Sequence, residues 1–263
     1  MLRTEQRRPE RVNILGVGVS VINMDEALRR SERLLDREEK GYICVTGVHG
    51  IMEAQRDESF RATLNRSFLC TPDGMPTVWI GRLRGHHEMS RVYGPDFMLQ
   101  LCQRSVERGC RHFLYGAQPD TLEKLQHCLE RVIPDIRIVG TYSPPFRPLS
   151  QPEEDELIAV VAEARPDIVW VGLSTPKQER FMARMIDRLD TRLMIGVGAA
   201  FDIHAGLLPD APNWMKNAGL QWLYRLMKEP RRLWRRYLAN NPRFLWQFGL
   251  QLSGVKKFEV KEL

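Results

Sequence analysis

The hydrophobic and polar positions of the first seventy residues predict short strands and amphipathic helices. Residues 11–23 alternate around two glycines, a pattern that is typical of a short hairpin. Residues 24–36 carry apolar side chains among charged ones at helical spacing, which predicts an amphipathic helix. The apolar runs at 42–45 and 68–71 are short and predict buried strands. We expect one or two helices between these runs, over residues 48–67.

Two further helices are predicted before residue 110. Residues 72–85 indicate a turn followed by a helix. Residues 94–109 predict a helix with Pro95 near its first turn, because proline fits the start of a helix. Gly109 is the expected C-terminal cap of that helix, since glycine adopts the left-handed conformation that such caps need.

From residue 111 onward, predicted strands and helices alternate regularly. Apolar runs at 111–116, 136–142, 167–174 and 192–198 predict strands, and the segments between them have helical patterns. This alternation predicts βαβ units and therefore an α/β fold with a mostly parallel sheet flanked by helices. Ligands of such sheets bind at the carboxyl ends of the strands, so the loops that follow the strands are the places to look for a site.

The pattern changes after residue 205. A loop-like stretch is followed by helical segments that are basic and aromatic, and we expect breaks at Pro230 and Pro242 because proline disrupts the interior of a helix. The sequence therefore predicts two units, an α/β domain over residues 1–210 and a helical appendage over residues 211–263.

The charge of the chain is concentrated in this appendage. Residues 216–263 hold eleven Lys/Arg and three Glu, a net charge of +8, whereas the whole chain carries +6. Four of the six tryptophans lie in or beside the same stretch. Basic and aromatic residues together suit an anionic, partly apolar partner such as a membrane surface. A surface helix packed on the core is the first alternative, and nucleic acid is the second, although no recognised nucleic-acid-binding motif is present.

The remaining composition narrows the class of protein. No run of about eighteen apolar residues exists, so we expect no membrane-spanning helix. The first twenty residues lack a sustained apolar stretch, so no secretory signal is expected. The five cysteines show no CxxC spacing and lie in or beside apolar segments, which predicts free, buried thiols in a reducing compartment. The expected location is therefore the cytoplasm.

Two residues in the first half of the chain are candidates for chemistry. Asp73 follows directly after the strand at 68–71, where a partly desolvated carboxylate can act as a general base. The alternative is a turn or helix cap, since Asp-Gly is a common turn pair. Arg91 lies in a loop and can bind phosphate, or it is an ordinary solvated arginine.

Further candidates follow the later strands. Gly116 and Ala117 can let a phosphate approach the next helix, or they form an ordinary turn. Lys177 and Gln178 open a helix and can reach a diphosphate or a sugar, although the start of a helix alone explains such residues. Asp202 can hydrogen-bond a base or ribose, or it lies on a helix surface.

Several common motifs are missing from the sequence. The early and late glycine clusters do not form GxGxxG, so they give little support to dinucleotide binding. The histidines show no metal-ligand spacing, and HExxH, DxD, GxSxG and the phosphate-binding P-loop are absent. The missing DxD argues against a sugar-nucleotide site that depends on Mn²⁺.

Taken in order, a series of motifs resembles one family. They are VTGVHGIMEAQRD (45–57), TPDGMPTVW (71–79), RVYGPDF (91–97), FLYGA (113–117), GTYSPPF (140–146), STPKQE (174–179) and GVGAAFDIHAG (196–206). The chain resembles the WecG/TagA/CpsF glycosyltransferases from about residue 12 to 245. The resemblance implies a Rossmann-like sheet and an inverting enzyme that moves a sugar from a UDP-sugar onto a glycan linked to undecaprenyl diphosphate.

The resemblance also implies roles for individual residues. Asp73 matches the proposed general base, and Thr46 matches a pocket threonine beside the sugar. Gln178 matches a pocket glutamine, and Arg91 matches a pocket arginine. Asp202 matches an acid near the nucleotide, which we group with the other donor-site candidates, Gly116, Ala117 and Lys177. The arginines of the appendage that would meet the acceptor diphosphate are Arg225, Arg232 and Arg235. Neither a divalent metal nor another cofactor is expected.

One departure from the family concerns the donor sugar. Many relatives have Thr-Pro-Asn where this chain has Thr46-Gly47-Val48, which removes the hydrogen-bonding groups of an asparagine beside the sugar. The donor therefore stays open between an N-acetylmannosamine, glucose or uronic acid nucleotide.

The sequence thus predicts a glycosyltransferase of bacterial exopolysaccharide or surface-polysaccharide assembly, peripheral on the inner face of the plasma membrane. Its expected partners are a UDP-sugar, a saccharide linked to a polyprenyl diphosphate and the membrane surface, with no nucleic acid and with a homo-oligomer left open. The alternatives are a soluble enzyme that modifies nucleotide-sugars and a non-catalytic adaptor that binds membrane or nucleic acid.

Overall fold

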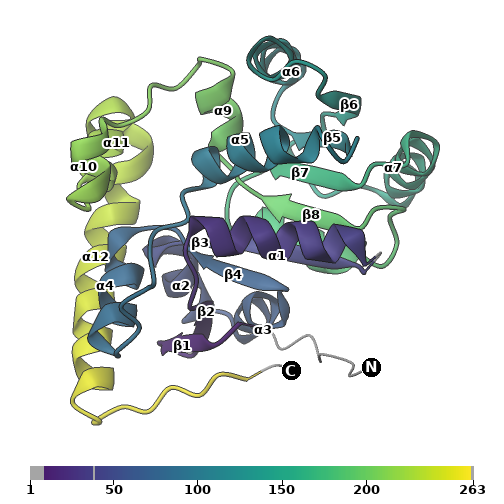
Figure 1. The fold of residues 1–263 in the computed structure, drawn as a ribbon. Coiled ribbons are helices and arrows are strands. Elements are labelled where there is room, and N and C mark those ends of the chain that lie inside the picture. Colours follow the sequence, from purple (N-terminus) through teal and green to yellow (C-terminus); the bar gives the residue numbers. More distant parts are fainter. Residues whose placement is uncertain (1–8, 38, 262–263) are drawn as a thin grey trace.

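The computed structural model describes residues 9–37 and 39–261. Within these residues, six parallel strands form a central sheet in the spatial order β4-β3-β8-β7-β5-β6 (Figure 1). The strands are β3 (Gly41–Thr46), β4 (Leu69–Pro72), β5 (Arg111–Gly116), β6 (Arg137–Tyr142), β7 (Ile168–Gly172) and β8 (Leu193–Gly196). The predicted α/β, Rossmann-like fold is confirmed, and each strand lies at or within about two residues of its predicted position.

Helices cover both faces of this sheet. They are α1 (Met24–Asp36), α2 (Val48–Ala54), α3 (Glu58–Arg66), α4 (Met75–Leu83), α5 (Gly94–Ser105), α6 (Pro119–Val132), α7 (Gln151–Ala164), α8 (Lys177–Met185) and α9 (Ala200–His204). Neighbouring side chains of each strand point to opposite faces, so Ile43 joins the apolar cluster with α1 and α5, and Cys44 joins the cluster with α2 and α8. Both faces are therefore buried, as parallel sheets require.

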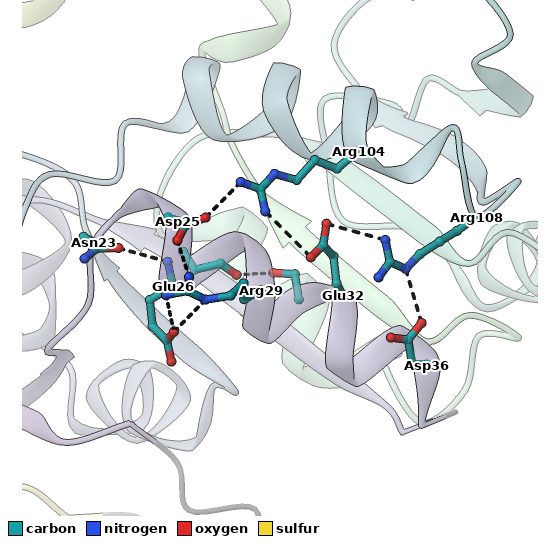
Figure 2. A network of polar contacts seen from close by, with 10 residues as sticks. Asn23, Asp25, Glu26, Arg29, Glu32, Asp36, Arg104 and Arg108 are labelled. Atoms are coloured by element: carbon teal, nitrogen blue, oxygen red, sulfur yellow. Dashed lines mark hydrogen bonds and ion pairs between the residues drawn. The ribbon is translucent and has the colours of Figure 1, made fainter.

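Ion pairs connect α1 with the end of α5 on the outside of the molecule (Figure 2). Arg104 Nη2 lies 2.9 Å from Asp25 Oδ1, Arg108 Nε lies 3.3 Å from Asp36 Oδ1, and Glu32 lies between the two arginines. These side chains are partly exposed, so each pair adds little to stability, and the apolar packing beneath them holds the helices together.

The end of α5 differs from its prediction. The helix stops at Ser105, and Val106 rather than Gly109 is its C-terminal cap. Gly109 closes the turn that follows, with a φ of +64°. The chain turns early because Ser105 Oγ bonds to the carbonyl of Cys102 and to His112 Nε2, while the Ser105 carbonyl accepts from the backbone of Cys110.

The predicted hairpin is confirmed and lies against the edge of the sheet. β1 (Arg11–Ile14) and β2 (Val17–Ser20) pair antiparallel, and the hydroxyl of Ser20 accepts a hydrogen bond from the backbone of Cys70 on β4. Asn65, at the end of α3, is fully buried. Its Oδ1 accepts a hydrogen bond from the backbone N–H of Gly18 on β2, and its Nδ2 donates to the carbonyl of Gly16 in the hairpin turn. The hairpin is thereby fixed to the α/β core.

Three helices follow the main sheet. They are α10 (Asn213–Asn217), α11 (Gln221–Lys228) and α12 (Pro230–Leu252), and the predicted unit boundary at 210/211 falls shortly before the first of them. The break at Pro230 is confirmed, but the break expected at Pro242 is wrong, because α12 continues through that residue. Leu233 and Phe244, on either side of Pro242, are both buried, so packing on the core holds the helix continuous.

The chain beyond α12 returns to the hairpin, where Figure 1 shows the last segment running back beneath the core. Asn13 Nδ2 donates to the carbonyl of Phe258, and Asn65 Nδ2 donates to the carbonyl of Lys261 at 2.9 Å. Gln251, near the end of α12, accepts from the backbone N–H of Leu15 at 3.0 Å. Hydrogen bonds thus fasten the C-terminal segment to the N-terminal hairpin.

All five cysteines are free thiols, as predicted, and all except the half-buried Cys128 are buried. Among the helices of the described chain, none has both the length and the apolar character needed to cross a bilayer.

Candidate active site

A large cavity opens at the carboxyl edge of the parallel sheet, next to the C-terminal helices. Its volume is about 1290 Å³, and it is lined by the loops that follow β3, β4, β5, β7 and β8 and by side chains of α11 and α12. Pockets for one small ligand occupy about 300–1000 Å³, so this cavity has room for parts of two substrates. Its position agrees with the general location of ligands in open α/β sheets.

Most of the residues singled out from the sequence line this cavity. They are Asp73, Arg91, Ala117, Lys177, Gln178, Asp202, Arg225 and Arg232. These residues come from loops and helices that are far apart in the sequence, and the fold brings them to one place because parallel strands direct all their carboxyl ends to one edge.

Thr46 and Gly116 lie beneath the cavity and are absent from its lining. Thr46 is 2% exposed, and its hydroxyl lies 3.4 Å from the carbonyl oxygen of Cys44. Gly116 ends β5, where a Cβ atom would come within 2.7 Å of the carbonyl oxygen of Gly172 on β7. In the structure Thr46 therefore supports the floor of the cavity, and Gly116 permits the close approach of two strands.

Arg235 also lies outside the cavity lining, and its neighbour Arg236 takes part instead. The guanidinium of Arg235 lies 5.2 Å from the ring centroid of Trp234. Arg236 lines the cavity with Arg225 and Arg232, and burial, with those two like charges, lowers its pKa. Among the described residues no carboxylate forms an ion pair with Arg236. Three cations converging on one cavity fit an anion such as a diphosphate.

Asp73 reaches the cavity through a tight approach of two loops. Its backbone N–H donates to the carbonyl of Thr46 at 3.0 Å, which extends the pairing of β3 and β4 by one step. Gly47 makes this possible, because a Cβ atom there would lie 2.5 Å from the carbonyl oxygen of Asp73. The loop geometry thus holds the carboxylate of Asp73 at the rim of the sheet.

Burial and the neighbouring positive charges have opposite effects on the pKa of Asp73. Burial raises the pKa of Asp73, while Arg91 and Arg225 oppose that rise. Arg91 Nη2 lies 3.5 Å from Asp73 Oδ1. A half-buried carboxylate with a raised pKa beside a cationic pocket is the arrangement expected of a general base.

Arg91 is held from two sides. Its guanidinium lies 4.2 Å from the ring centroid of Tyr93, and its Nη2 also donates to the side-chain oxygen of Gln221 on α11. The hydroxyl of Tyr93 in turn donates to Asp210 at 2.6 Å, and Lys216 pairs with the other oxygen of Asp210 at 2.9 Å. The chain leading into the C-terminal helices thus fixes Arg91 beside Asp73.

The opposite wall of the cavity carries the start of α8 and the short helix α9. Lys177 Nζ lies 5.7 Å from the ring centroid of Phe146, and the side chain of Gln178 is 3% exposed. Burial raises the pKa of Asp202, and Arg232 opposes that rise. Asp202 and Arg232 therefore interact electrostatically across the gap between α9 and α12.

His49 follows β3 and lines the cavity. Burial lowers the pKa of His49 to about 4, and Arg236 adds to this effect, so the ring is neutral at pH 7. Asn240 Nδ2 lies 3.1 Å from His49 Nδ1, while Asn240 Oδ1 accepts from Arg56 at 3.2 Å. These bonds tie α12 to α2.

Within residues 9–37 and 39–261, no group of three or more His, Cys, Asp or Glu side chains is placed to hold a metal ion.

A carboxylate with a cationic pocket lies at the carboxyl edge of this Rossmann-like sheet, where open α/β sheets bind their ligands. The chain belongs to the glycosyl transferase WecG/TagA/CpsF family, whose family model matches residues 12–257. The predicted class, a glycosyltransferase, is thereby confirmed.

Two curated relatives are similar over most of their length. An N-acetylglucosaminyldiphosphoundecaprenol N-acetyl-beta-D-mannosaminyltransferase of Bacillus subtilis is 33% identical over 187 residues, which are 71% of this chain and 70% of the relative. A transferase of the same name from Bacillus spizizenii is 29% identical over 205 residues, which are 78% of this chain and 77% of the relative.

Proposed function

We propose that this glycosyltransferase moves a hexose from a UDP-sugar to a saccharide linked to undecaprenyl diphosphate, in the assembly of a bacterial surface polysaccharide. The observation that carries the proposal is the placement of Asp73 and Arg91 in one cavity with Arg225, Arg232 and Arg236. The site combines a base for an acceptor hydroxyl with cations for two diphosphates. The two named relatives act on an acceptor of this kind.

The mechanism follows from these roles. Asp73 takes the proton of the acceptor hydroxyl while the oxygen of that hydroxyl forms a bond to the anomeric carbon of the donor sugar. The bond between that carbon and the diphosphate oxygen breaks, and UDP leaves with the bonding electron pair. Because the acceptor attacks the face opposite the leaving group, the anomeric configuration inverts. Arginines stabilise the negative charge that develops on the departing UDP.

We also propose that transfer needs no divalent metal. Arg225, Arg232 and Arg236 line the same cavity, and guanidinium groups bind phosphate oxygens in pairs of hydrogen bonds. Burial lowers the pKa of Arg236, and the like charges of Arg232 and Arg225 add to this effect, so a bound anion would stabilise the charged guanidinium. Retention of activity in excess EDTA is the expected result, and loss that added Mg²⁺ or Mn²⁺ restores would contradict this part.

Contact with the cytoplasmic membrane surface is part of the same proposal. Trp214 and Trp246 are 66% and 70% exposed. The helix α4 adds the exposed Leu83 and Trp79, of which Trp79 lies beside Gly219, between α10 and α11. A cationic surface with exposed tryptophans suits anionic lipid headgroups. An acceptor on a prenyl chain would then reach the cavity from the bilayer.

The residues that follow β3 bear on the choice of donor sugar. Gly47 and Val48 lie in the cavity lining where an asparagine would offer two hydrogen-bonding functions. N-acetylmannosamine, glucose and a uronic acid all remain candidates for the donor sugar.

The experiment that tests the function has two steps. A thermal-shift panel of UDP-sugars, with EDTA present, should show stabilisation by UDP and by one sugar nucleotide above the others. That nucleotide is then incubated with a synthetic prenyl-diphosphate N-acetylglucosamine, and the product is identified by mass spectrometry. Stabilisation by UDP-sugars without transfer to any prenyl-linked acceptor would instead favour an enzyme that modifies nucleotide-sugars.

A further inference from the structure

Glu179 is a carboxyl group buried directly behind the cavity wall. It is 1% exposed and is not among the residues that line the cavity. One of its oxygens, Oε1, accepts hydrogen bonds from Thr175 Oγ1 at 2.8 Å and from Gln178 Nε2 at 3.1 Å. No donor among the described residues reaches the other oxygen, Oε2. Glu179 therefore touches the site only through its two neighbours.

The bond to Glu179 decides which end of the Gln178 amide meets the cavity. Since Nε2 of Gln178 donates to Glu179, the other end of this amide is the oxygen Oε1 of Gln178. No described group donates a hydrogen bond to that oxygen. A Cβ atom on Gly198 would lie 3.4 Å from this Oε1, whereas a Cβ atom on Gly196 would lie 3.1 Å from Nε2. Gly198 lines the cavity and Gly196 does not, so the oxygen is the end nearer to the ligand.

An amide oxygen can only accept a hydrogen bond. A buried acceptor without a partner is unfavourable, and a ligand that donates to it removes that cost. A ligand group without a hydrogen to donate, or one that is methylated, leaves the oxygen unpaired. This point of the wall therefore discriminates between ligands by whether they carry a hydroxyl or an N–H.

We propose that Glu179 is a positioning residue that holds the oxygen of Gln178 toward the cavity, so that Gln178 selects a ligand group that donates a hydrogen bond. The proposal rests on the proposed function, in which the ligand is a UDP-sugar. Such a ligand carries three kinds of hydrogen-bond donor, the imide N–H of uracil, the hydroxyls of the ribose and the polar hydrogens of the transferred sugar.

The hydrogen bonds of Glu179 fit this role. Burial raises the pKa of Glu179, and the bonds to Thr175 and Gln178 oppose that rise. Both bonds are accepted by one oxygen, Oε1. A glutamine at this position also offers one amide oxygen as acceptor, so it is the conservative replacement.

The experiment measures the affinity of the full chain for UDP, N3-methyl-UDP, UDP-glucose and UDP-N-acetylmannosamine by isothermal titration calorimetry. Gln178→Met should weaken binding of a ligand that donates to this oxygen by about tenfold, the size of one neutral hydrogen bond. Glu179→Met should produce the same loss, because the amide is then free to turn. Glu179→Gln should bind within about twofold of the wild type.

The ligand series identifies the group that Gln178 meets. If it is the imide, N3-methylation weakens binding of UDP to the wild type, and neither Gln178→Met nor Glu179→Met is sensitive to the methyl group. If it is a ribose hydroxyl, Gln178→Met and Glu179→Met bind UDP more weakly, and N3-methylation has no effect on the wild type. If it is a donor on the transferred sugar, all variants bind UDP like the wild type, and the loss appears only with a UDP-sugar. Each of these results supports the proposal.

Other results overturn it. Equal losses from Glu179→Gln and Glu179→Met would show that Glu179 only supports the fold, and unchanged affinities in Gln178→Met would show that its oxygen meets no ligand. Should Glu179→Met not fold, Gln178→Glu decides the matter, because a carboxylate still offers an oxygen there. Loss of the preference for hydrogen-donating ligands in that variant overturns the proposal. Absence of binding by the wild type to all four ligands would instead refute the proposed function itself.

Discussion

Gln221, in the first turn of α11, accepts a hydrogen bond from Arg91, which lies 130 residues earlier in the chain. Through the same Nη2 atom Arg91 reaches Asp73 at 3.5 Å. The candidate base is therefore connected to the C-terminal helices by a single arginine. Arg225, one turn after Gln221, also acts on the carboxyl of Asp73. Docking of α11 thus shapes the electrostatics of the active site.

This connection predicts the effect of Gln221→Ala. Arg91 keeps its contact with Tyr93 but loses the partner that aligns it on Asp73. We expect turnover to fall about tenfold, the equivalent of one charge-assisted hydrogen bond, with little change in thermal stability. Steady-state kinetics measures the loss. Gln126→Ala is the control, since Gln126 bonds only at the surface of α6 to Glu130. Equal turnover in both variants would show that Arg91 needs no alignment from α11.

Replacement of the candidate base tests the mechanism directly. Asp73→Asn should cut turnover about 10²–10⁴-fold, as loss of a general base does, while folding and UDP binding stay near normal. Single-turnover kinetics and a thermal shift with UDP measure the two effects separately. Asp120→Asn, on the exposed first turn of α6, is the matched control and should behave like the wild type. Turnover near that of the wild type in Asp73→Asn would remove Asp73 from the mechanism.

The same carboxyl predicts a pH dependence. Asp73 acts as a base only when it is deprotonated, so activity should fall as the pH drops through its pKa. Burial raises that pKa, and Arg91 and Arg225 oppose the rise. Removing the charge in Arg225→Gln should raise the pKa further, so the acid limb of kcat/KM should move to higher pH by about one unit.

The control for this shift is Arg235→Gln, because Arg235 lies against Trp234 and does not line the cavity. Its pH profile should coincide with that of the wild type. An acid limb that stays in place in Arg225→Gln, or moves to lower pH, would mean that another group controls the profile.

The main features of the fold were predictable because they depend on local patterns. Apolar runs and helical periodicity place the strands and helices of the sheet, and Gly and Pro mark most of the turns. The exceptions have tertiary causes. Pro242 is tolerated inside α12 because Leu233 and Phe244 pack on the core, and α5 stops at Ser105 because that side chain bonds to His112. Contacts of this kind leave no periodic signal in the sequence.

The site was predictable only in part, for a similar reason. Residues that follow strands, such as Asp73 and Gln178, reach the cavity because the topology brings strand ends together. The C-terminal arginines depend on helix phase and docking, and here Arg236, one turn after Arg232, lines the cavity in place of Arg235. Gln221 could not be found, because its partner lies far away in the sequence and a lone glutamine carries no motif.

A stability prediction concerns the connection between the two ends of the chain. Asn65 is fully buried, accepts from the backbone of Gly18 at 2.9 Å, and donates to the carbonyls of Gly16 and Lys261. Asn65→Ala leaves these groups unpaired and should lower the free energy of unfolding by about 1–3 kcal/mol. Urea denaturation measures it, with the exposed Asn217→Ala as control. Identical midpoints would show that water replaces all three bonds without cost.

The last prediction separates two segments of α12, about four turns apart. Arg232 lines the cavity and pairs with Glu229 at 2.5 Å, whereas Trp246, further along the same helix, is largely exposed. Arg232→Ala should reduce transfer to a short-chain, water-soluble acceptor and leave sedimentation with phosphatidylglycerol vesicles close to normal. Trp246→Ala should weaken sedimentation and leave transfer to the soluble acceptor intact, because an interfacial tryptophan contributes to membrane binding rather than to chemistry.

Val132→Ala, which trims an exposed apolar side chain on α6, controls for a general loss of surface hydrophobicity and should change neither measurement. Both main substitutions lie on one helix, so a disturbance of α12 as a whole would lower transfer and sedimentation together in each variant. Crossed losses require that the segment around Arg232 meets the substrates while the segment around Trp246 meets lipid. Matched losses in Arg232→Ala and Trp246→Ala would therefore refute the division of α12 into a catalytic segment and a membrane segment.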